Sequence, residues 1–173
     1  MRMRLQGKAA KAAASGLLLA AAILLSYIES ILGLQTSFLP GMKLGLANVI
    51  VTFAFFEVSA SKSAAISFCR LIIIGMLFGS PISFLYSLCG AILSFGGLYL
   101  SRRLGGRVSY IGVSVICACL HNVGQTAVAA CFFGTAVAAF YLPYLLISGA
   151  VFGAVTGFLL NFLSNKYKEI ISK

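Results

Sequence analysis

Six apolar runs follow one another along the chain, and only short stretches of polar or turn-forming residues separate them. The runs cover approximately residues 12–32, 44–61, 63–79, 82–101, 109–133 and 139–163. A helix needs about 20 apolar residues to cross the hydrocarbon core of a bilayer, and these runs are close to that length or exceed it. They lack the alternation of polar and apolar positions that barrel strands require. The pattern therefore predicts an all-α, integral membrane bundle of six transmembrane helices.

The basic residues are distributed between the apolar runs in a way that predicts the orientation of the chain. If the chain crosses six times, eleven of the thirteen Lys and Arg residues lie at the termini or in the second and fourth connections, which share one side. These are Arg2, Arg4, Lys8, Lys11, Lys62, Arg102, Arg103, Arg107, Lys166, Lys168 and Lys173. Of the other two, Lys43 falls in a connection on the opposite side and Arg70 lies within the third run. Because short cytoplasmic loops are enriched in Lys and Arg, we expect a multi-pass protein of the cell membrane with both termini cytoplasmic.

The first run has a second interpretation, as a cleaved signal peptide. It follows the basic segment 1–11, and the alanines at 20–22 provide small residues for cleavage. These alanines lie inside the run, however, which continues to Leu32. A retained helix fits better, so we expect a basic N-terminal tail at 1–11, a transmembrane domain at 12–163 and a basic C-terminal tail at 164–173.

Composition agrees with a membrane protein and argues against soluble classes. Hydrophobic residues make up 61% of the chain and charged residues 9%, and the mean hydropathy is +1.05, whereas a soluble domain carries about 25% charged residues. The net charge of +10 would indicate nucleic-acid binding in a soluble domain. Here the basic residues lie between apolar runs and not along one amphipathic face. We therefore expect contact with the lipid bilayer and none with nucleic acid.

The chain lacks the residue patterns that support catalysis by itself. All three acidic residues are Glu, so an aspartate-rich magnesium site is absent, and so is a glycine-rich phosphate-binding loop. The cysteines fall within apolar runs without the spacing of a disulfide framework, and we interpret them as small buried apolar residues. They are Cys69, Cys89, Cys117, Cys119 and Cys131. We expect no catalytic residue, no metal and no cofactor.

A polar group stands in the middle of the fifth run. His121 and Gln125 are four residues apart and share one face of the predicted helix, which Asn122 borders. Polar residues inside a membrane are costly and are therefore candidates for function by default. Two interpretations stay open: these side chains join neighbouring helices by hydrogen bonds, or they line a ligand cavity.

Three further polar residues lie near the predicted outer ends of the first two helices. Glu29 and Lys43 flank the connection at 33–42, and Asn48 lies about one turn below Lys43. This connection has the most room for a structured loop, so we expect it to act as a lid. Glu29 and Lys43 either form a salt bridge that closes the connection or contact a ligand directly.

Arg70 is a permanent charge inside a predicted helix, about two turns from Lys62. Its guanidinium either extends to the inner surface or faces the interior of the bundle. In the second case it would hold an anionic ligand or a cluster of internal carbonyl groups.

Small residues form stripes at four-residue spacing on the first and sixth predicted helices. Ala12, Gly16 and Ala20 form the first stripe, and the glycines at 149, 153 and 157 form the second. Small residues allow another helix to approach closely. The first stripe is suited to internal packing or to docking of a partner subunit.

Several local strings resemble one known family. They are Lys-Leu-Gly-Leu-Ala-Asn at 43–48, the helix with Arg70, Ser-Leu-Cys-Gly-Ala at 87–91, His-Asn-Val-Gly-Gln at 121–125 and Tyr-Leu-Pro at 141–143. Over about residues 15–160 the chain resembles the Gx transporter family, also labelled heptaprenyl diphosphate synthase component I. That family is similar to the substrate-binding S components of energy-coupling factor transporters.

The resemblance implies a membrane subunit that binds a small molecule from outside and delivers it inward with a transmembrane coupling subunit that carries ATPases. Its ligand would be a flavin or an isoprenoid or quinone precursor, bound by His121, Asn122, Gln125, Asn48, Lys43, Arg70 and Glu29. Tyr86 and Phe132 would supply apolar walls. The stripe of Ala12, Gly16 and Ala20 would dock the coupling subunit. The second label implies an alternative, a non-catalytic membrane subunit or anchor associated with a prenyl diphosphate synthase or an electron-transfer protein.

Overall fold

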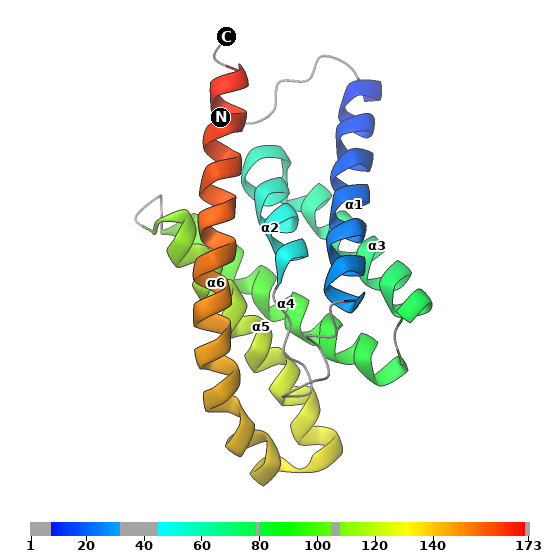
Figure 1. Cartoon of the computed structure of the whole chain (residues 1–173), viewed down its shortest axis with the longest axis vertical. Coiled ribbons are helices and arrows are strands. Elements are labelled where there is room, and N and C mark those ends of the chain that lie inside the picture. The colour runs from blue at the N-terminus through cyan, green and yellow to red at the C-terminus, as the bar shows by residue number, and fades with distance from the viewer. Residues whose placement is uncertain (1–7, 32–44, 79, 105–107, 172–173) are drawn as a thin grey trace.

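The computed structural model describes residues 8–31, 45–78, 80–104 and 108–171, and helices cover almost all of them (Figure 1). Their order is α1 (Lys8–Ile31), α2 (Leu46–Phe53), the π-helical turn η1 (Ala54–Val58), α3 (Ala60–Phe78), α4 (Pro81–Arg103), α5 (Tyr110–Phe133) and α6 (Thr135–Ile171). No strand occurs in these ranges. The all-α prediction is confirmed for the described part of the chain.

Local sequence explains where the long helices begin and end. The Ser80 hydroxyl accepts a hydrogen bond from the Ser83 N–H at the start of α4, and Pro81 occupies the first helical position. Both features are typical of helix N-termini. The Ser109 hydroxyl caps α5 in the same way by accepting from the Gly112 N–H. At the other end of α5, Gly134 has a φ of 89°, a backbone conformation that favours glycine.

The second predicted transmembrane helix is shorter in the structure than the prediction. The apolar run at 44–61 forms a helical stretch of only Leu46–Val58, about 20 Å long at 1.5 Å per residue, against a hydrocarbon core of about 30 Å. Gly45, with a φ of 74°, precedes the stretch, and extended backbone at Ser59 ends it. The other five predicted runs correspond to five helices that are long and apolar enough to cross a membrane. The last of them is longer than expected and covers Thr135–Ile171.

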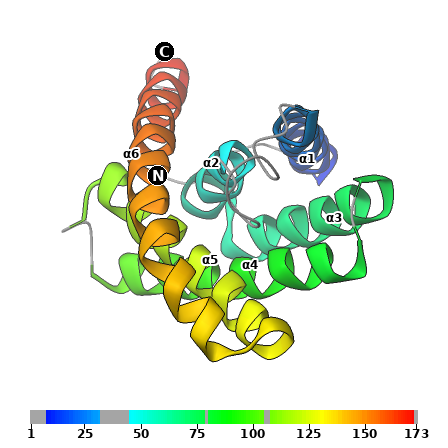
Figure 2. The same cartoon turned by 60° about the horizontal axis from the view of Figure 1, so that its bottom comes forward.

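Helix α5 packs against both α4 and α6 (Figure 2), and glycines lie at the closest approaches. A Cβ at Gly157 would lie 2.6 Å from the Ile111 Cα, and one at Gly153 would lie 2.8 Å from the Val115 Cα. Gly124 of α5 meets the backbone of α4 in the same way. The predicted close approach along the glycine stripe of α6 is therefore confirmed, and its partner is α5.

Helices α1, α2 and α3 form the other part of the bundle, and α2 lies between α1 and α6 (Figure 1). Most side chains of α2 are buried. Ile50 of α2 packs with Ala22 of α1 and Ile66 of α3 in one apolar cluster. The short helix α2 is thus an internal element on which the neighbouring helices converge.

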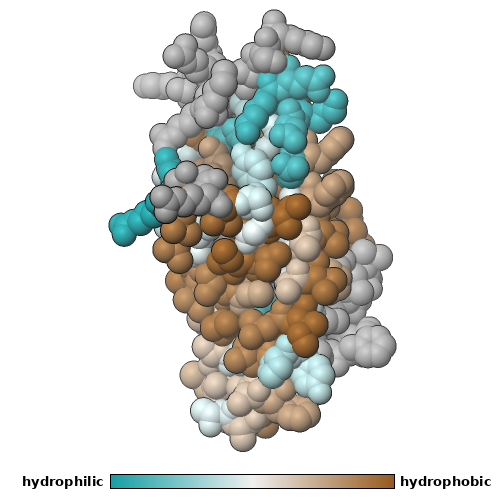
Figure 3. All heavy atoms as spheres, turned by 90° about the vertical axis from the view of Figure 1, so that its left-hand side faces the viewer, coloured by the Kyte–Doolittle hydropathy of each residue, from teal (hydrophilic) through white to brown (hydrophobic). Residues whose placement is uncertain are grey.

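The outer surface carries many large apolar side chains, including Leu17, Met76, Ile92 and Phe158. In the view of Figure 3, hydrophobic residues cover the middle of the molecule, and the most hydrophilic residues gather towards one end. Cys69 and Cys131 are also exposed, so the expectation of buried cysteines is wrong at these two positions. Five long apolar helices with an apolar surface are the features of a multi-pass membrane protein.

Candidate ligand-binding cavity

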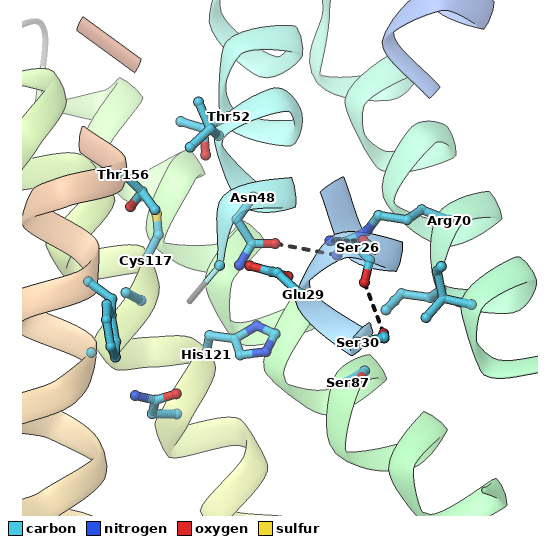
Figure 4. Close-up of a pocket in the computed structure, with 18 of the residues that line it drawn as sticks. Ser26, Glu29, Ser30, Asn48, Thr52, Arg70, Ser87, Cys117, His121 and Thr156 are labelled. Atoms are coloured by element: carbon cyan, nitrogen blue, oxygen red, sulfur yellow. Dashed lines mark hydrogen bonds between the residues drawn. The ribbon is translucent and has the colours of Figure 1, made fainter. Parts of the chain in front are cut away.

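A polar cavity of about 80 Å³ lies inside the bundle, and all six α-helices contribute to its wall. Figure 4 shows Glu29, Asn48, Arg70 and His121 turned toward this space from four different helices. Serine and threonine hydroxyls supply much of the remaining polar lining. Charged and polar side chains are costly inside a membrane protein, so their convergence on one cavity marks a candidate site.

Arg70 lies in the wall of this cavity and not at an end of the bundle. Its side chain is buried, with 7% exposed, and it projects from α3 toward α1 and α2. Nη1 donates to the Ser26 hydroxyl and Nη2 donates to Asn48 Oδ1, both at 3.3 Å. Nε has no hydrogen-bond partner among the described residues. Of the two expected orientations of Arg70, the inward one is therefore found.

Glu29 links α1 to the start of α2. One of its carboxylate oxygens accepts a hydrogen bond from the Leu46 N–H. The N-terminus of α2 is preceded by Gly45, which has no side chain to cap it, so the carboxylate of another helix serves as the acceptor there, where negative charge is favourable. Lys43, the expected salt-bridge partner, lies outside the described residues, as does the connection at 33–42.

Glu29 also lines the same cavity as His121 (Figure 4). Helices α1 and α5 both turn these side chains toward the cavity, although the two residues are far apart in the sequence. Side chains from different helices meet where their faces converge.

The polar group of α5 is divided in the structure. His121 lines the cavity, and its ring packs so closely against α4 that a Cβ at Gly90 would lie 2.7 Å from the ring. Asn122 also lines the cavity, but its amide donates to the Leu145 carbonyl of α6 and so joins two helices. Both side chains thus face the cavity, and Asn122 also serves as a link between α5 and α6.

Gln125 is not among the residues that line the cavity. Its side chain is almost completely buried, and neither amide atom has a hydrogen-bond partner within the described ranges. His121 and Gln125 share a helix face, but the cavity does not extend along this face as far as Gln125. The structure brings together Asn48, Arg70, Glu29, His121 and Asn122, and leaves out Gln125.

The apolar wall of the cavity differs from the expected one. Tyr86 is not part of it, and Phe132 is 52% exposed on the outer surface. Rings of Phe78, Phe84 and Phe152 line the cavity instead. Which aromatic residues face inward depends on helix rotation, and apolar residues of a membrane helix face lipid as readily as the interior.

Several hydroxyl groups of the cavity were not expected from the sequence. They belong to Ser26, Ser30, Thr52, Ser87, Ser114 and Thr156. For two of them the sequence contains a signal, because Ser26 stands three residues before Glu29 and four residues before Ser30, spacings that place side chains on one helix face. For the others, single hydroxyls in apolar helices carry no comparable pattern.

A separate groove of about 480 Å³ runs between α1 and α3. Ala12 and Gly16 of the predicted docking stripe line it, together with apolar and small residues of α3 and Lys62. Ala20 is exposed on the same helix. A Cβ at Gly16 would meet no atom within 4 Å, so this stripe is open and is not used for packing inside the bundle.

The helices and the apolar surface define a multi-pass membrane protein, and the cavity inside the bundle is its candidate site. A family model described as heptaprenyl diphosphate synthase component I matches residues 18–163, and the chain belongs to this family. Comparisons with curated proteins and with solved structures find no match. The family name implies association with a prenyl diphosphate synthase subunit. It is the name of a non-catalytic subunit, in agreement with the expectation that the chain is not itself an enzyme.

Proposed function

We propose that this protein is a substrate-binding membrane subunit, similar to an S component, of an ATP-driven uptake system for a small molecule. One observation carries the proposal: charged and polar side chains from α1, α2, α3 and α5 converge on one cavity inside a bundle of apolar helices. Buried charges are expensive, and pockets with a few convergent polar groups in an apolar frame are typical of ligand sites. Asn48, Arg70 and His121 would orient the ligand.

The volume of the cavity limits what it holds in this conformation. Ligand pockets usually measure about 300 to 1,000 Å³, whereas this cavity measures about 80 Å³. A flavin, or an isoprenoid or quinone precursor, therefore requires the bundle to open further. We expect that the polar end of the ligand occupies the described cavity and that helix movement admits the remainder.

The groove between α1 and α3 supports docking of a partner helix. A transmembrane coupling subunit that carries ATPases would pack against the stripe of Ala12, Gly16 and Ala20 on the open face of α1. Small residues bring helix backbones close together, which favours van der Waals packing in a membrane. Energy for release of the ligand would come from this partner.

Native mass spectrometry of the purified protein tests the binding role. We expect one small molecule bound to the wild type, and its loss in a variant with both His121→Ala and Asn48→Ala. Val123→Ala, at an exposed position of the same helix, is the matched control and should retain the molecule. Full retention by the double variant would refute the cavity assignment.

The docking role is tested with Gly16→Leu, which fills the groove without touching the cavity. We expect this variant to keep its bound molecule and to lose co-purification of the coupling subunit and ATPases. Leu24→Phe enlarges an exposed side chain of the same helix outside the groove and should keep the partners. Equal partner recovery in both variants would contradict the docking surface.

The family name favours a second candidate function, a membrane anchor that recruits a prenyl diphosphate synthase subunit. The exposed basic residues Arg102 and Arg103 at the end of α4 would then form part of the contact surface, with Arg107 outside the described residues. Arg102→Glu with Arg103→Glu should release the synthase if the protein is an anchor. The same variant should retain uptake if the cavity carries the function.

A further inference from the structure

Two oppositely charged side chains line the cavity. Glu29 of α1 and Arg70 of α3 both line it, and the carboxylate interacts electrostatically with the guanidinium (Figure 4). Among the described residues of the wall, no other Lys, Arg or Glu occurs. The described lining is therefore balanced in formal charge, apart from any proton that His121 binds.

This balance is unfavourable for a strongly anionic ligand. Phosphate groups are usually held by clusters of Arg and Lys, or by Mg²⁺ on carboxylates. The described part of the cavity wall offers one guanidinium, whose charge Glu29 opposes, and the chain contains no aspartate. A diphosphate would bring additional negative charge next to the buried Glu29 carboxylate, where uncompensated charge is costly.

An uncharged polar group has suitable partners in the same place. Arg70 is held by Ser26 and Asn48 through its two terminal nitrogens, and its buried Nε remains without a hydrogen-bond partner in the described structure. That N–H can donate to one acceptor of a ligand. The surrounding serine and threonine hydroxyls can both donate and accept.

We propose that Glu29 is a specificity residue that neutralises Arg70 and excludes diphosphates, so that the cavity accepts an uncharged or zwitterionic polar group. This inference rests on the proposed function, because it names the class of ligand for the same cavity. The ligand would then differ from the diphosphates that are the substrates of a prenyl diphosphate synthase. The membrane subunit binds a different molecule.

Replacing Glu29 by Gln removes the negative charge and keeps nearly the same side-chain shape. The Gln side chain keeps an oxygen that accepts from the Leu46 N–H, so the link between α1 and α2 is retained. Arg70 loses its counter-charge and should become an anion site. Glu57 provides a matched control, because it is also a buried glutamate, accepts a hydrogen bond from the Tyr110 hydroxyl and does not line the cavity.

The test is thermal stabilisation of the purified, full-length protein in detergent by inorganic pyrophosphate without divalent cations. The wild type and Glu57→Gln should show no saturable stabilisation. Glu29→Gln should bind pyrophosphate at least about tenfold more tightly than the wild type. Adding Arg70→Gln to Glu29→Gln should abolish this gain, because the cation that attracts the anion is then gone.

Three results would overturn the inference: equal pyrophosphate binding by the wild type and Glu29→Gln, an equal gain in Glu57→Gln, or a gain that survives the loss of Arg70. If Glu29→Gln does not fold, thermal stabilisation of the wild type by pyrophosphate and by a prenyl diphosphate tests the inference instead. Saturable stabilisation that Arg70→Gln removes would then contradict the inference, and its absence would support it.

The mass spectrometry described above distinguishes failure of this inference from failure of the proposed function. A co-purifying diphosphate that depends on His121 and Asn48 would preserve the binding role and refute exclusion of anions by Glu29. A protein that carries no small molecule under any condition would refute the binding role, while the pyrophosphate result for Glu29→Gln would be unaffected.

Discussion

Different interactions hold the helices together within each of the two parts of the bundle. In α4, α5 and α6, glycines bring backbones into direct contact, as at Gly157 against Ile111. In α1, α2 and α3, side-chain hydrogen bonds carry more of the connection, including Arg70 with Ser26 and Asn48. The cavity lies where the two parts meet.

This difference indicates which part is able to move. Backbone contact through glycine leaves no space for a shift, because any displacement separates or overlaps whole helices. A side-chain hydrogen bond can be exchanged for a bond to a ligand with little movement of the helix. We therefore expect α4, α5 and α6 to act as a fixed frame, and α1, α2 and α3 to rearrange when a ligand enters.

The largest expected effect on stability is that of Arg70→Met. It removes the buried guanidinium that donates to Ser26 and Asn48 and that interacts electrostatically with Glu29. Removing one charged partner from a buried polar network in this way costs about 3 to 5 kcal/mol. The free energy of unfolding in mixed micelles measures the loss. The variant with both Arg70→Met and Glu29→Gln should recover part of it, and strict additivity of the two changes would argue against a direct interaction between these residues.

Gly157→Ala should destabilise the glycine-packed part by about 1 to 3 kcal/mol, because the added methyl group overlaps the backbone of α5. The same unfolding measurement applies. Gly96→Ala is the matched control, since a Cβ there meets nothing within 4 Å, and alanine favours a helix over glycine by about 1 kcal/mol. Similar losses of unfolding free energy in both variants would show that close helix packing at Gly157 does not stabilise this part of the bundle.

Gly90→Ala tests whether the close packing of α4 on α5 positions His121 in the cavity. Its Cβ would push the His121 ring from its present position, so we expect binding of the co-purified small molecule to weaken about tenfold, corresponding to one lost hydrogen bond of about 1.4 kcal/mol. Titration of the released molecule back onto the protein measures the change. Combining Gly90→Ala with His121→Ala should add little, and full additivity would contradict an effect through the ring.

Ser63→Ala should have the smallest of these effects, a loss of about 1 kcal/mol in the free energy of unfolding. The Ser63 hydroxyl donates to the Val51 carbonyl at 2.6 Å and joins α3 to α2. Ser61, two positions earlier on the same helix, is exposed, and Ser61→Ala should be close to neutral. A loss in Ser61→Ala as large as that in Ser63→Ala would remove the evidence that such bonds hold this part together.

The candidate site was only partly predictable from the sequence. Asn48, His121 and Asn122 stand out because amide and imidazole groups are rare in apolar runs, and all three line the cavity. Gln125 stands out for the same reason, yet it lies outside the cavity. A spacing of four residues places two side chains on one helix face, but it does not state how far along that face the cavity extends.

The sequence by itself determined the helical class, the apolar character and most helix boundaries, because these depend on local composition and on capping residues such as Ser80 and Ser109. Only the tertiary structure decided that α2 is short, that Glu29 meets Arg70 and His121 in one cavity, and that the stripe on α1 remains open. The physical reason is that lipid and protein interior are both apolar. The hydrophobic pattern of a membrane helix therefore does not mark its inward face, and helix packing has to select it.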